Sequence, residues 1–396
     1  MSTAGLDHLV FERGEVGNTW RTQRWDSFRL NTPNWMRELP GSPYVGTAPD
    51  AFGTTAEWID QLERYVRDHS LPVRTRTAVT VVEAGAGGFS ISTSAGERFD
   101  ARNVIVAAGV QNAAKLPPVA RDIDPKIVRV TTAQYRRPAQ LPPGGVLVVG
   151  SAQSGCQIAE DLLDAGREVY LATGKVGRAP RRLRGRDTFA WLEDAGWFSQ
   201  RPQDLPDPAM LRWAQPQTSG TGPRGHTVSY QSLAGRGVTL LGHLEGAVGA
   251  RLSFADDLSA HIRFADEVAA RIRQTVDDHI ARVGADAPTT DPDPADSPVD
   301  DPSRFSGPTE LDLVDRGIRS VIFSTGFGGD LSWLRVPVLD ERGAPVHAEG
   351  RAQVEGVWFV GLPWMRTRKS GILRGAAEDS AHIVEQIAAR QRTRLS

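Results

Sequence analysis

An apolar strand, a glycine turn and a helix follow one another without interruption at residues 146–163. Residues 146–149 read Val-Leu-Val-Val and end at Gly150. Ser-Ala-Gln-Ser-Gly follows, and from Cys156 the apolar residues recur with helical spacing. A buried parallel strand that turns through glycines into a helix is the unit on which dinucleotide-binding folds seat a pyrophosphate. The segment therefore predicts an α/β fold with nicotinamide or flavin chemistry; a purely structural tight turn is the alternative.

The glycines of this turn have separate roles. Gly150 lets the chain turn tightly, and Gly155 lets the helix approach the strand closely. The middle position of the pattern, usually glycine, is Ala152, whose methyl group crowds a pyrophosphate slightly. We predict that the turn binds a dinucleotide through Gly150, Ala152, Gln153, Ser154 and Gly155.

The strand after the helix indicates which dinucleotide is bound. It ends at Thr173, where NAD sites carry an acidic residue for the ribose 2′-hydroxyl, and Arg178 and Arg181 follow closely. A hydroxyl and guanidinium groups would bind a 2′-phosphate, whereas a carboxylate would repel it. The sequence therefore favours NADPH, with Thr173, Arg178 and Arg181 as ligands. The alternative is that arginine is simply the usual cation here, because only four of the 46 basic residues are lysines.

Two further strands share one ending. Residues 103–109 and 320–327 are short apolar runs followed by two small residues and a glycine. Each alone could be an ordinary buried strand. As a pair on either side of the turn, they predict that the chain crosses there between two nucleotide-binding domains.

Several segments together resemble one family of enzymes. They are residues 14–21, residues 25–33, the turn at 150–155, residues 324–327 and residues 361–372. In these segments the chain resembles the flavin-containing monooxygenase-type flavoproteins, a group that includes indole-pyruvate monooxygenases of plants and many actinobacterial proteins. The resemblance runs nearly from end to end. It implies an α/β fold with two Rossmann-like, doubly wound dinucleotide-binding domains, and FAD and NADPH as cofactors.

The resemblance also divides the chain. It implies that residues 1–140 begin an FAD-binding domain, that residues 141–303 form an inserted NADP-binding domain, and that residues 304–396 complete the FAD-binding domain.

Local patterns predict smaller features inside these domains. Alternating apolar residues at 79–93 predict an antiparallel meander. The apolar spacing of residues 256–283 predicts an amphipathic helix packed on a core, and the Asp- and Pro-rich residues 285–302 predict a solvated loop. Four aromatic residues predict either the wall of a substrate pocket or core packing; they are Trp191, Trp197, Phe198 and Trp213.

One departure from the family concerns the beginning of the chain. Members open with a strand and a first G-x-G-x-x-G helix for FAD, whereas the first eleven residues here contain one glycine, Gly5. We therefore expect the first FAD-domain strand and its helix to be missing. Losing the helix would weaken FAD binding by roughly a hundredfold to ten-thousandfold. Losing the strand would leave backbone groups unpaired. Our hypothesis is that the native protein starts further upstream.

The resemblance implies one catalytic residue. Asn31 corresponds to the family's asparagine at the flavin and nicotinamide edge, where it would donate a hydrogen bond to a flavin C4a-hydroperoxide. The alternative is a turn asparagine two residues before Pro33. The other residues implied as cofactor neighbours are Glu12, Trp20, Arg21, Thr32, Val79, Ala108, Gly109, Thr325, Gly326, Gly361, Leu362, Ser370, Gly371 and Ile372.

The reaction implied is the oxygenation of a small organic substrate by O2, driven by NADPH. The motif F-x-G-x-x-x-H-x-x-x-Y/W of many such monooxygenases is incomplete, because Pro125, Ile127 and Thr131 stand at its Phe, Gly and His positions. An NADPH oxidase or reductase without oxygenation therefore stays open, and so does a fragment that binds nucleotide without catalysis.

Composition excludes other functions. The chain has one cysteine, Cys156, so dithiol chemistry within one chain is excluded, and we expect this residue to be a packing residue. A net charge of -2 gives no reason to expect nucleic acid or an anionic membrane as partner. Without a long apolar run or a signal peptide, we expect a cytoplasmic protein. The eight histidines have no metal-ligand spacing, so we expect no metal.

Overall fold

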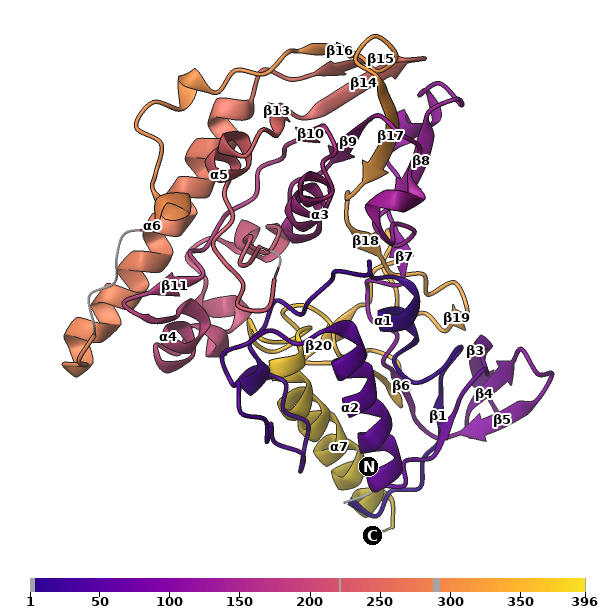
Figure 1. Cartoon of the computed structure of the whole chain (residues 1–396). Coiled ribbons are helices and arrows are strands. Elements are labelled where there is room, and N and C mark those ends of the chain that lie inside the picture. Colours follow the sequence, from indigo (N-terminus) through magenta and orange to yellow (C-terminus); the bar gives the residue numbers. More distant parts are fainter. Residues whose placement is uncertain (1–3, 221, 288–292, 396) are drawn as a thin grey trace.

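A five-stranded parallel sheet forms the centre of the middle part of the chain (Figure 1). The computed structural model describes residues 4–220, 222–287 and 293–395. The strand order is β13-β10-β9-β17-β8, and every neighbouring pair is parallel. The strands are β8 (Val128–Thr131), β9 (Gly145–Val149), β10 (Val169–Ala172), β13 (Thr239–Leu241) and β17 (Ile318–Phe323).

Apolar residues of β9 alternate between two cores, one on each face of the sheet. Val146 and Val148 belong to a core that includes residues of α3 (Gln153–Asp164), α5 (Tyr230–Gly235) and α6 (Leu258–Val283). Leu147 and Val149 belong to the opposite core. That core includes residues of an antiparallel sheet made of β14 (Leu244–Val248), β15 (Arg251–Phe254) and β16 (Glu310–Asp312). Because both faces are covered, the strand is a continuous apolar run.

The five-stranded sheet extends beyond residues 141–303, the range predicted for the inserted domain. β8 precedes this range and β17 follows it, yet β17 lies between β9 and β8. Parallel neighbours are joined by long crossover connections, so strands adjacent in space are distant in sequence. The prediction is therefore corrected on both sides: residues 128–131 and 318–323 are part of this sheet.

The terminal parts of the chain form smaller sheets. β1 (Val10–Phe11) pairs in parallel with β2 (Val73–Arg74). β6 (Val104–Val106) pairs in parallel with β22 (Val357–Phe359) in a separate sheet that continues through β21 (Arg351–Ala352) to β20 (His347–Ala348). A third sheet has the order β19-β3-β4-β5, from Leu334–Arg335, Val79–Gly85, Gly88–Thr93 and Arg98–Ala101.

Helices and short pairs complete the structure. α2 (Thr55–Asp68) begins at a capping box in which Thr54 and Glu57 satisfy each other's backbone N–H groups. The remaining helices and strands are α1 (Asn18–Thr22), α4 (Thr188–Asp194), α7 (Leu373–Leu395), β7 (Ala113–Ala114), β18 (Phe327–Gly328), β11 (Arg182–Leu183) and β12 (Arg186–Asp187). Short 3-10 helices lie at Asn34–Met36, Pro118–Arg121, Pro138–Gln140, Trp197–Ser199, Pro202–Asp204, Pro208–Arg212, Pro294–Asp296 and Pro302–Arg304.

Two local predictions are confirmed, and one needs correction. β3 and β4 pair antiparallel over residues 79–93. α6 packs its apolar face on the core and ends at Gly284, which has a left-handed backbone. Part of the predicted loop, residues 288–292, lies outside the described residues. The rest is not uniformly solvated, because Asp296 is buried and ion-paired.

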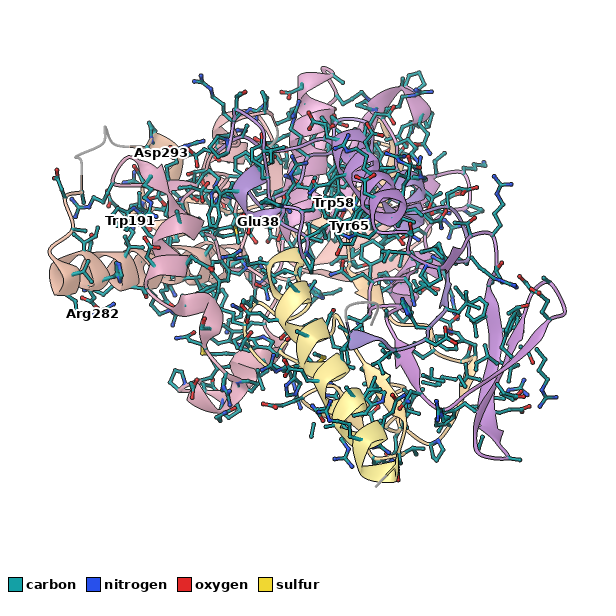
Figure 2. The ribbon with its side chains drawn as sticks, turned by 90° about the horizontal axis from the view of Figure 1, so that it is seen from below. Glu38, Trp58, Tyr65, Trp191, Arg282 and Asp293 are labelled. Atoms are coloured by element: carbon teal, nitrogen blue, oxygen red, sulfur yellow. The ribbon has the colours of Figure 1, made fainter. Side chains whose placement is uncertain are left out.

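The four aromatic residues differ in burial. Trp191 and Phe198 are buried in one core cluster, and Trp197 packs against it. Figure 2 shows Trp191 close to the end of α6 that carries Arg282, and its ring contacts that of His279. Trp213 is exposed. Core packing therefore accounts for Trp191 and Phe198.

Candidate functional site

The turn between β9 and α3 needs both of its glycines. Gly150 has φ of +100°, and a Cβ atom there would lie 2.5 Å from the carbonyl oxygen of Ser324. A Cβ on Gly155 would lie 1.8 Å from the carbonyl oxygen of Gly150. The neighbours are backbone atoms that cannot move aside, so these glycines let α3 pack directly on the ends of β9 and β17.

The N-terminus of α3 carries no side-chain cap. Its N-cap residue is Ala152, and among the described residues no side chain forms the cap hydrogen bond. Gln153, Ser154 and Gly155 form that turn. Backbone N–H groups of a first helical turn, together with the helix dipole, favour an anion at this position. The geometry therefore suits a phosphate group.

The buried hydroxyl groups of Ser151 and Tyr230 fasten the turn to Gly174, which follows β10. The backbone N–H of Gly174 donates to the Ser151 hydroxyl at 2.9 Å. The Tyr230 hydroxyl donates to the Gly174 carbonyl at 2.9 Å and lies 2.7 Å from the Ser151 hydroxyl. Burial raises the pKa of Tyr230, so it stays protonated as a donor. Nothing in the local sequence around Tyr230 marks it as part of the turn.

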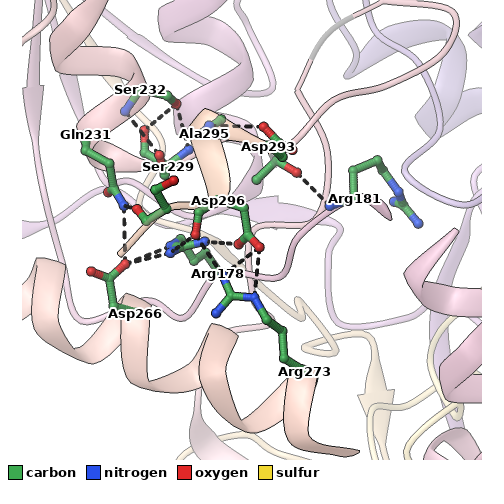
Figure 3. A network of polar contacts seen from close by, with 12 residues as sticks. Arg178, Arg181, Ser229, Gln231, Ser232, Asp266, Arg273, Asp293, Ala295 and Asp296 are labelled. Carbon is green, nitrogen blue, oxygen red and sulfur yellow. Dashed lines mark hydrogen bonds and ion pairs between the residues drawn. The ribbon is translucent and has the colours of Figure 1, made fainter. Parts of the chain in front are cut away.

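The residues predicted to bind a 2′-phosphate form hydrogen bonds and ion pairs with other residues of the protein. The Thr173 hydroxyl donates to the Leu241 carbonyl at 2.7 Å and lies 2.9 Å from His261 Nδ1. Arg178 is fully buried and paired with Asp266 and Asp296, as Figure 3 shows.

Arg181 is also buried and pairs with Asp187. Neither guanidinium group is open to a ligand in this structure, so the predicted phosphate-binding roles of Arg178 and Arg181 are corrected. The first exposed cation after β10 is Lys175.

Asn31 lies beside the helix that follows the turn. Its side-chain Oδ1 accepts a hydrogen bond from Gln157 Nε2 at 3.0 Å, across 126 residues of sequence. Its backbone carbonyl accepts from Arg181 Nη1 at 3.2 Å. Asn31 is partly exposed, and so is the neighbouring Thr32. The fold thus brings the predicted catalytic residue to α3, one turn beyond the glycine turn.

Residues 217–220 run across the start of α3. Gln153 Oε1 accepts from the Thr218 backbone N–H at 2.7 Å, and Gln217 Nε2 donates to the Ser151 carbonyl. Gln157 Nε2 also donates to the Ser219 carbonyl at 3.1 Å. The sequence offered no signal for this crossing, because Gln-Thr-Ser-Gly has no periodicity or motif.

Three predicted flavin neighbours near the beginning of the chain contact other residues of the protein. Glu12 Oε1 accepts from the Gly14 backbone N–H at 2.9 Å. The Trp20 ring packs against the rings of Phe28 and Trp58. Arg21 pairs with Glu63 on α2. Val79 lies at the start of β3, opposite Thr93.

Three predicted glycines in the terminal region face open space. Gly109, Gly326 and Gly361 have φ of +66°, +85° and +78°, and a Cβ on any of them would meet no atom within 4 Å. Ala108 is exposed. The end of the predicted strand 320–327 meets the segment that follows residues 103–109, because the Lys115 N–H donates to the Gly326 carbonyl and the Thr325 hydroxyl donates to the Lys115 carbonyl.

The C-terminal motif is tightly packed. Ser370 Oγ accepts from the backbone N–H groups of Arg366 and Thr367, both at 3.1 Å. A Cβ on Gly371 would lie 2.8 Å from the Pro363 nitrogen. Leu362 is buried, and Ile372 packs against the cluster that contains Trp191.

Cys156 has the features of a packing residue. It is fully buried, and its Sγ donates to the Ser151 carbonyl at 3.3 Å. Burial raises its thiol pKa, so a reactive thiolate does not form. In the described part of the chain, no group of three or more His, Cys, Asp or Glu side chains could hold a metal ion. None of the described helices is long and apolar enough to cross a membrane.

Comparison with known proteins finds similar oxidoreductases. Residues 1–188 match a family model described as pyridine nucleotide-disulphide oxidoreductase. Over 381 residues, the chain is 28% identical to an uncharacterized CzcO-like oxidoreductase of Geobacillus kaustophilus, covering 96% of this chain and 90% of that protein. The chain is an oxidoreductase similar to the pyridine nucleotide-disulphide oxidoreductases and the flavin monooxygenases.

Solved structures share the fold. A flavin-containing monooxygenase from Stenotrophomonas maltophilia is 19% identical and superposes with a TM-score of 0.62, covering 96% of this chain and 98% of that one. OTEMO, solved as a complex with FAD and NADP, is 15% identical with a TM-score of 0.54, covering 99% of this chain and 81% of that one. The α/β fold of these proteins therefore extends over nearly the whole chain.

Proposed function

We propose that this chain is an NADPH-dependent flavoprotein monooxygenase that oxygenates a small organic substrate with O2. The observation that carries the proposal is the hydrogen bond between Asn31 and Gln157. It joins the residue expected at the flavin edge to the helix whose N-terminus suits a dinucleotide phosphate. A nicotinamide cofactor bound at the turn would therefore extend toward Asn31.

The turn between β9 and α3 fits the pyrophosphate of NADPH. Gly150, Ala152, Gln153, Ser154 and Gly155 would surround it, and the uncapped N–H groups of α3 would donate to its oxygens. The hydrogen bonds of Ser151 and Tyr230 hold the turn in place before the ligand arrives. Pre-organisation of this kind lowers the entropy lost on binding.

The open sides of Gly109, Gly326 and Gly361 fit FAD, because a cofactor could pass them without meeting a Cβ atom. FAD, when bound, would accept a hydride from NADPH and react with O2. The chain's own part is to hold the two cofactors together, to keep water away, and to offer the Asn31 amide N–H as a donor at the flavin edge.

Preference for NADPH over NADH would rest on Lys175. This residue follows β10, at the place where the adenosine ribose lies in dinucleotide folds, and it is exposed. Its Nζ lies 4.8 Å from the centre of the Phe264 ring, a contact that limits the positions of the ammonium group. This proposal replaces the one based on Arg178 and Arg181.

The visible spectrum of the purified full chain tests the proposal, with and without added FAD. We expect a yellow protein that NADPH bleaches in the absence of O2 and that regains its colour in air. A colourless protein that does not bind added FAD would contradict the proposal. With labelled O2 and a panel of substrates, label in a product supports oxygenation. Release of one H2O2 per NADPH with every substrate would instead indicate an oxidase.

A further inference from the structure

One face of α3 carries three polar residues that all bind the same segment. Gln153, Gln157 and Glu160 are spaced by four and three residues, which places them on one side of the helix. Gln153 and Gln157 contact Thr218 and Ser219. Glu160 Oε1 lies 2.7 Å from His226 Nε2. Residues 217–220 and His226 are therefore held along α3 from its first turn onward.

The contact with Ser219 determines the orientation of the Gln157 amide. A backbone carbonyl oxygen can only accept, so the atom of Gln157 that faces the Ser219 carbonyl must be Nε2. Gln157 is 3% exposed, so little water reaches this contact. Its Oε1 is buried without a hydrogen-bond partner in the described structure. The arrangement thus retains the two Nε2 contacts and leaves the acceptor of Gln157 unsatisfied.

The orientation of the Gln157 amide determines that of the Asn31 amide. Because Gln157 Nε2 donates, the atom of Asn31 facing it is the acceptor Oδ1, at 3.0 Å. The Asn31 Nδ2 group, the other end of the amide, therefore faces away from α3. Arg181 links Asn31 to the segment that contains Ser219, because its Nη1 donates to the Asn31 carbonyl at 3.2 Å and to the Thr218 carbonyl at 3.1 Å.

We propose that Gln157 is a positioning residue: by donating to Ser219 and to Asn31 together, it fixes the Asn31 amide with its N–H donors turned away from α3. Only one consequence of this inference rests on the proposed function, namely that the Asn31 N–H donors face the flavin edge. Movement of residues 217–220 when a nucleotide binds at the turn would act on Asn31 through the same two hydrogen bonds.

Side-chain NMR of asparagine tests the inference without any cofactor. The chain contains only five asparagines, namely Asn18, Asn31, Asn34, Asn103 and Asn112. Labelling their amide nitrogens gives few signals, and loss of one signal pair in Asn31→Asp assigns Asn31. In the wild type, we expect the Asn31 amide protons to exchange freely with solvent, because they face away from the helix.

Gln157→Glu reverses the polarity of the contact at nearly constant shape. A carboxylate only accepts, so the Asn31 amide should rotate and donate to it. One Asn31 amide proton should then shift and exchange about tenfold more slowly, as expected for a hydrogen bond to a charged acceptor. Gln157→Met, which removes both hydrogen bonds without adding charge, should also move the Asn31 signals if Gln157→Glu does not fold.

Gln140→Glu serves as the matched control, since Gln140 is exposed and contacts Arg136 and Gln134 rather than Asn31. We expect it to leave the Asn31 signals unchanged. Wild-type Asn31 signals in a folded Gln157 variant would overturn the inference.

Measurements on the FAD-loaded enzyme separate this inference from the proposed function. Both Gln157 variants should increase the H2O2 released per NADPH consumed, because the donor is no longer fixed. Altered Asn31 signals with unchanged H2O2 release would keep the positioning role of Gln157 and contradict the role proposed for Asn31.

Discussion

The strands beside the dinucleotide turn in the middle region and two strands of the terminal region are covered to different degrees. Every residue of β9 and β10 is buried, in one sheet with a core on each face. In the terminal region, β1 has no fully buried residue, and β6 has one. Leu9 and Val10 are 39% and 44% exposed. Contacts on all sides therefore determine the dinucleotide turn. Three of the four glycines expected beside the flavin, Gly109, Gly326 and Gly361, lie where the backbone has room.

The largest difference in unfolding free energy between the regions should follow from replacing a buried arginine in one and an exposed arginine in the other. Arg178→Met removes the buried cation that pairs with both Asp266 and Asp296, and we expect it to lower the free energy of unfolding by about 3–5 kcal/mol. Arg74→Met, in the terminal region, breaks a surface pair with Glu97 and should cost less than about 1 kcal/mol. Denaturant unfolding measures both. Equal effects would remove the distinction between the regions.

The next largest difference should be in the stability lost when a glycine of each region is replaced by alanine. Gly155→Ala places Cβ 1.8 Å from a backbone oxygen, and we expect a loss of about 3 kcal/mol together with loss of NADP binding. Gly361→Ala meets no atom and should lose only the roughly 1–2 kcal/mol of a left-handed backbone. Thermal unfolding and a fluorescence titration with NADP report the two outcomes. A more severe effect at Gly361 would reverse our view of the terminal region.

The pH dependence of stability should involve one histidine from each region. Burial lowers the pKa of His261, in the middle region, and of His347, in the terminal region, below 6.5. The unfolded chain therefore binds a proton at a higher pH than the folded chain, and stability falls as pH drops below about 6.5. Each histidine contributes at most about 1.4 kcal/mol per pH unit.

His261→Gln and His347→Gln should each reduce this slope. Urea unfolding between about pH 7 and about pH 5 measures the change. Slopes equal to the wild type in both variants would show that neither histidine is responsible.

The smallest change in unfolding free energy should follow from a substitution in the exposed strand β1. Val10→Thr replaces a half-exposed side chain, and we expect a change within about 0.5 kcal/mol. Val148→Thr, the same substitution in a fully buried strand, introduces a hydroxyl group into the core and should cost about 1–3 kcal/mol. A loss at Val10 as large as that at Val148 would mean that another part of the protein covers β1.

The sequence predicted the parts of the fold that depend on neighbouring residues. The strand, turn and helix at 146–163 and the helix at 258–283 were found because apolar spacing and glycine act within one segment. The position of β17 between β9 and β8 was not predicted, because pairing between distant strands leaves no local pattern.

In the candidate site, too, the local features were predicted and the contacts between distant residues were not. The turn residues followed from a motif, but the fate of Arg178 depended on Asp266 and Asp296, which are 88 and 118 residues away. The link between Gln157 and Asn31 spans 126 residues. A cluster of cations is visible in a sequence, whereas the carboxylates that neutralise it become visible only when the chain is folded.

The central place of β17 determines how this protein could be cut or recombined. A gene fragment coding for residues 141–303 would lack β17 and β8, and would expose the edge of β9 along its whole length. The smallest contiguous piece that keeps all five strands spans residues 128–323. A domain exchange with a relative should therefore place its crossovers outside that span.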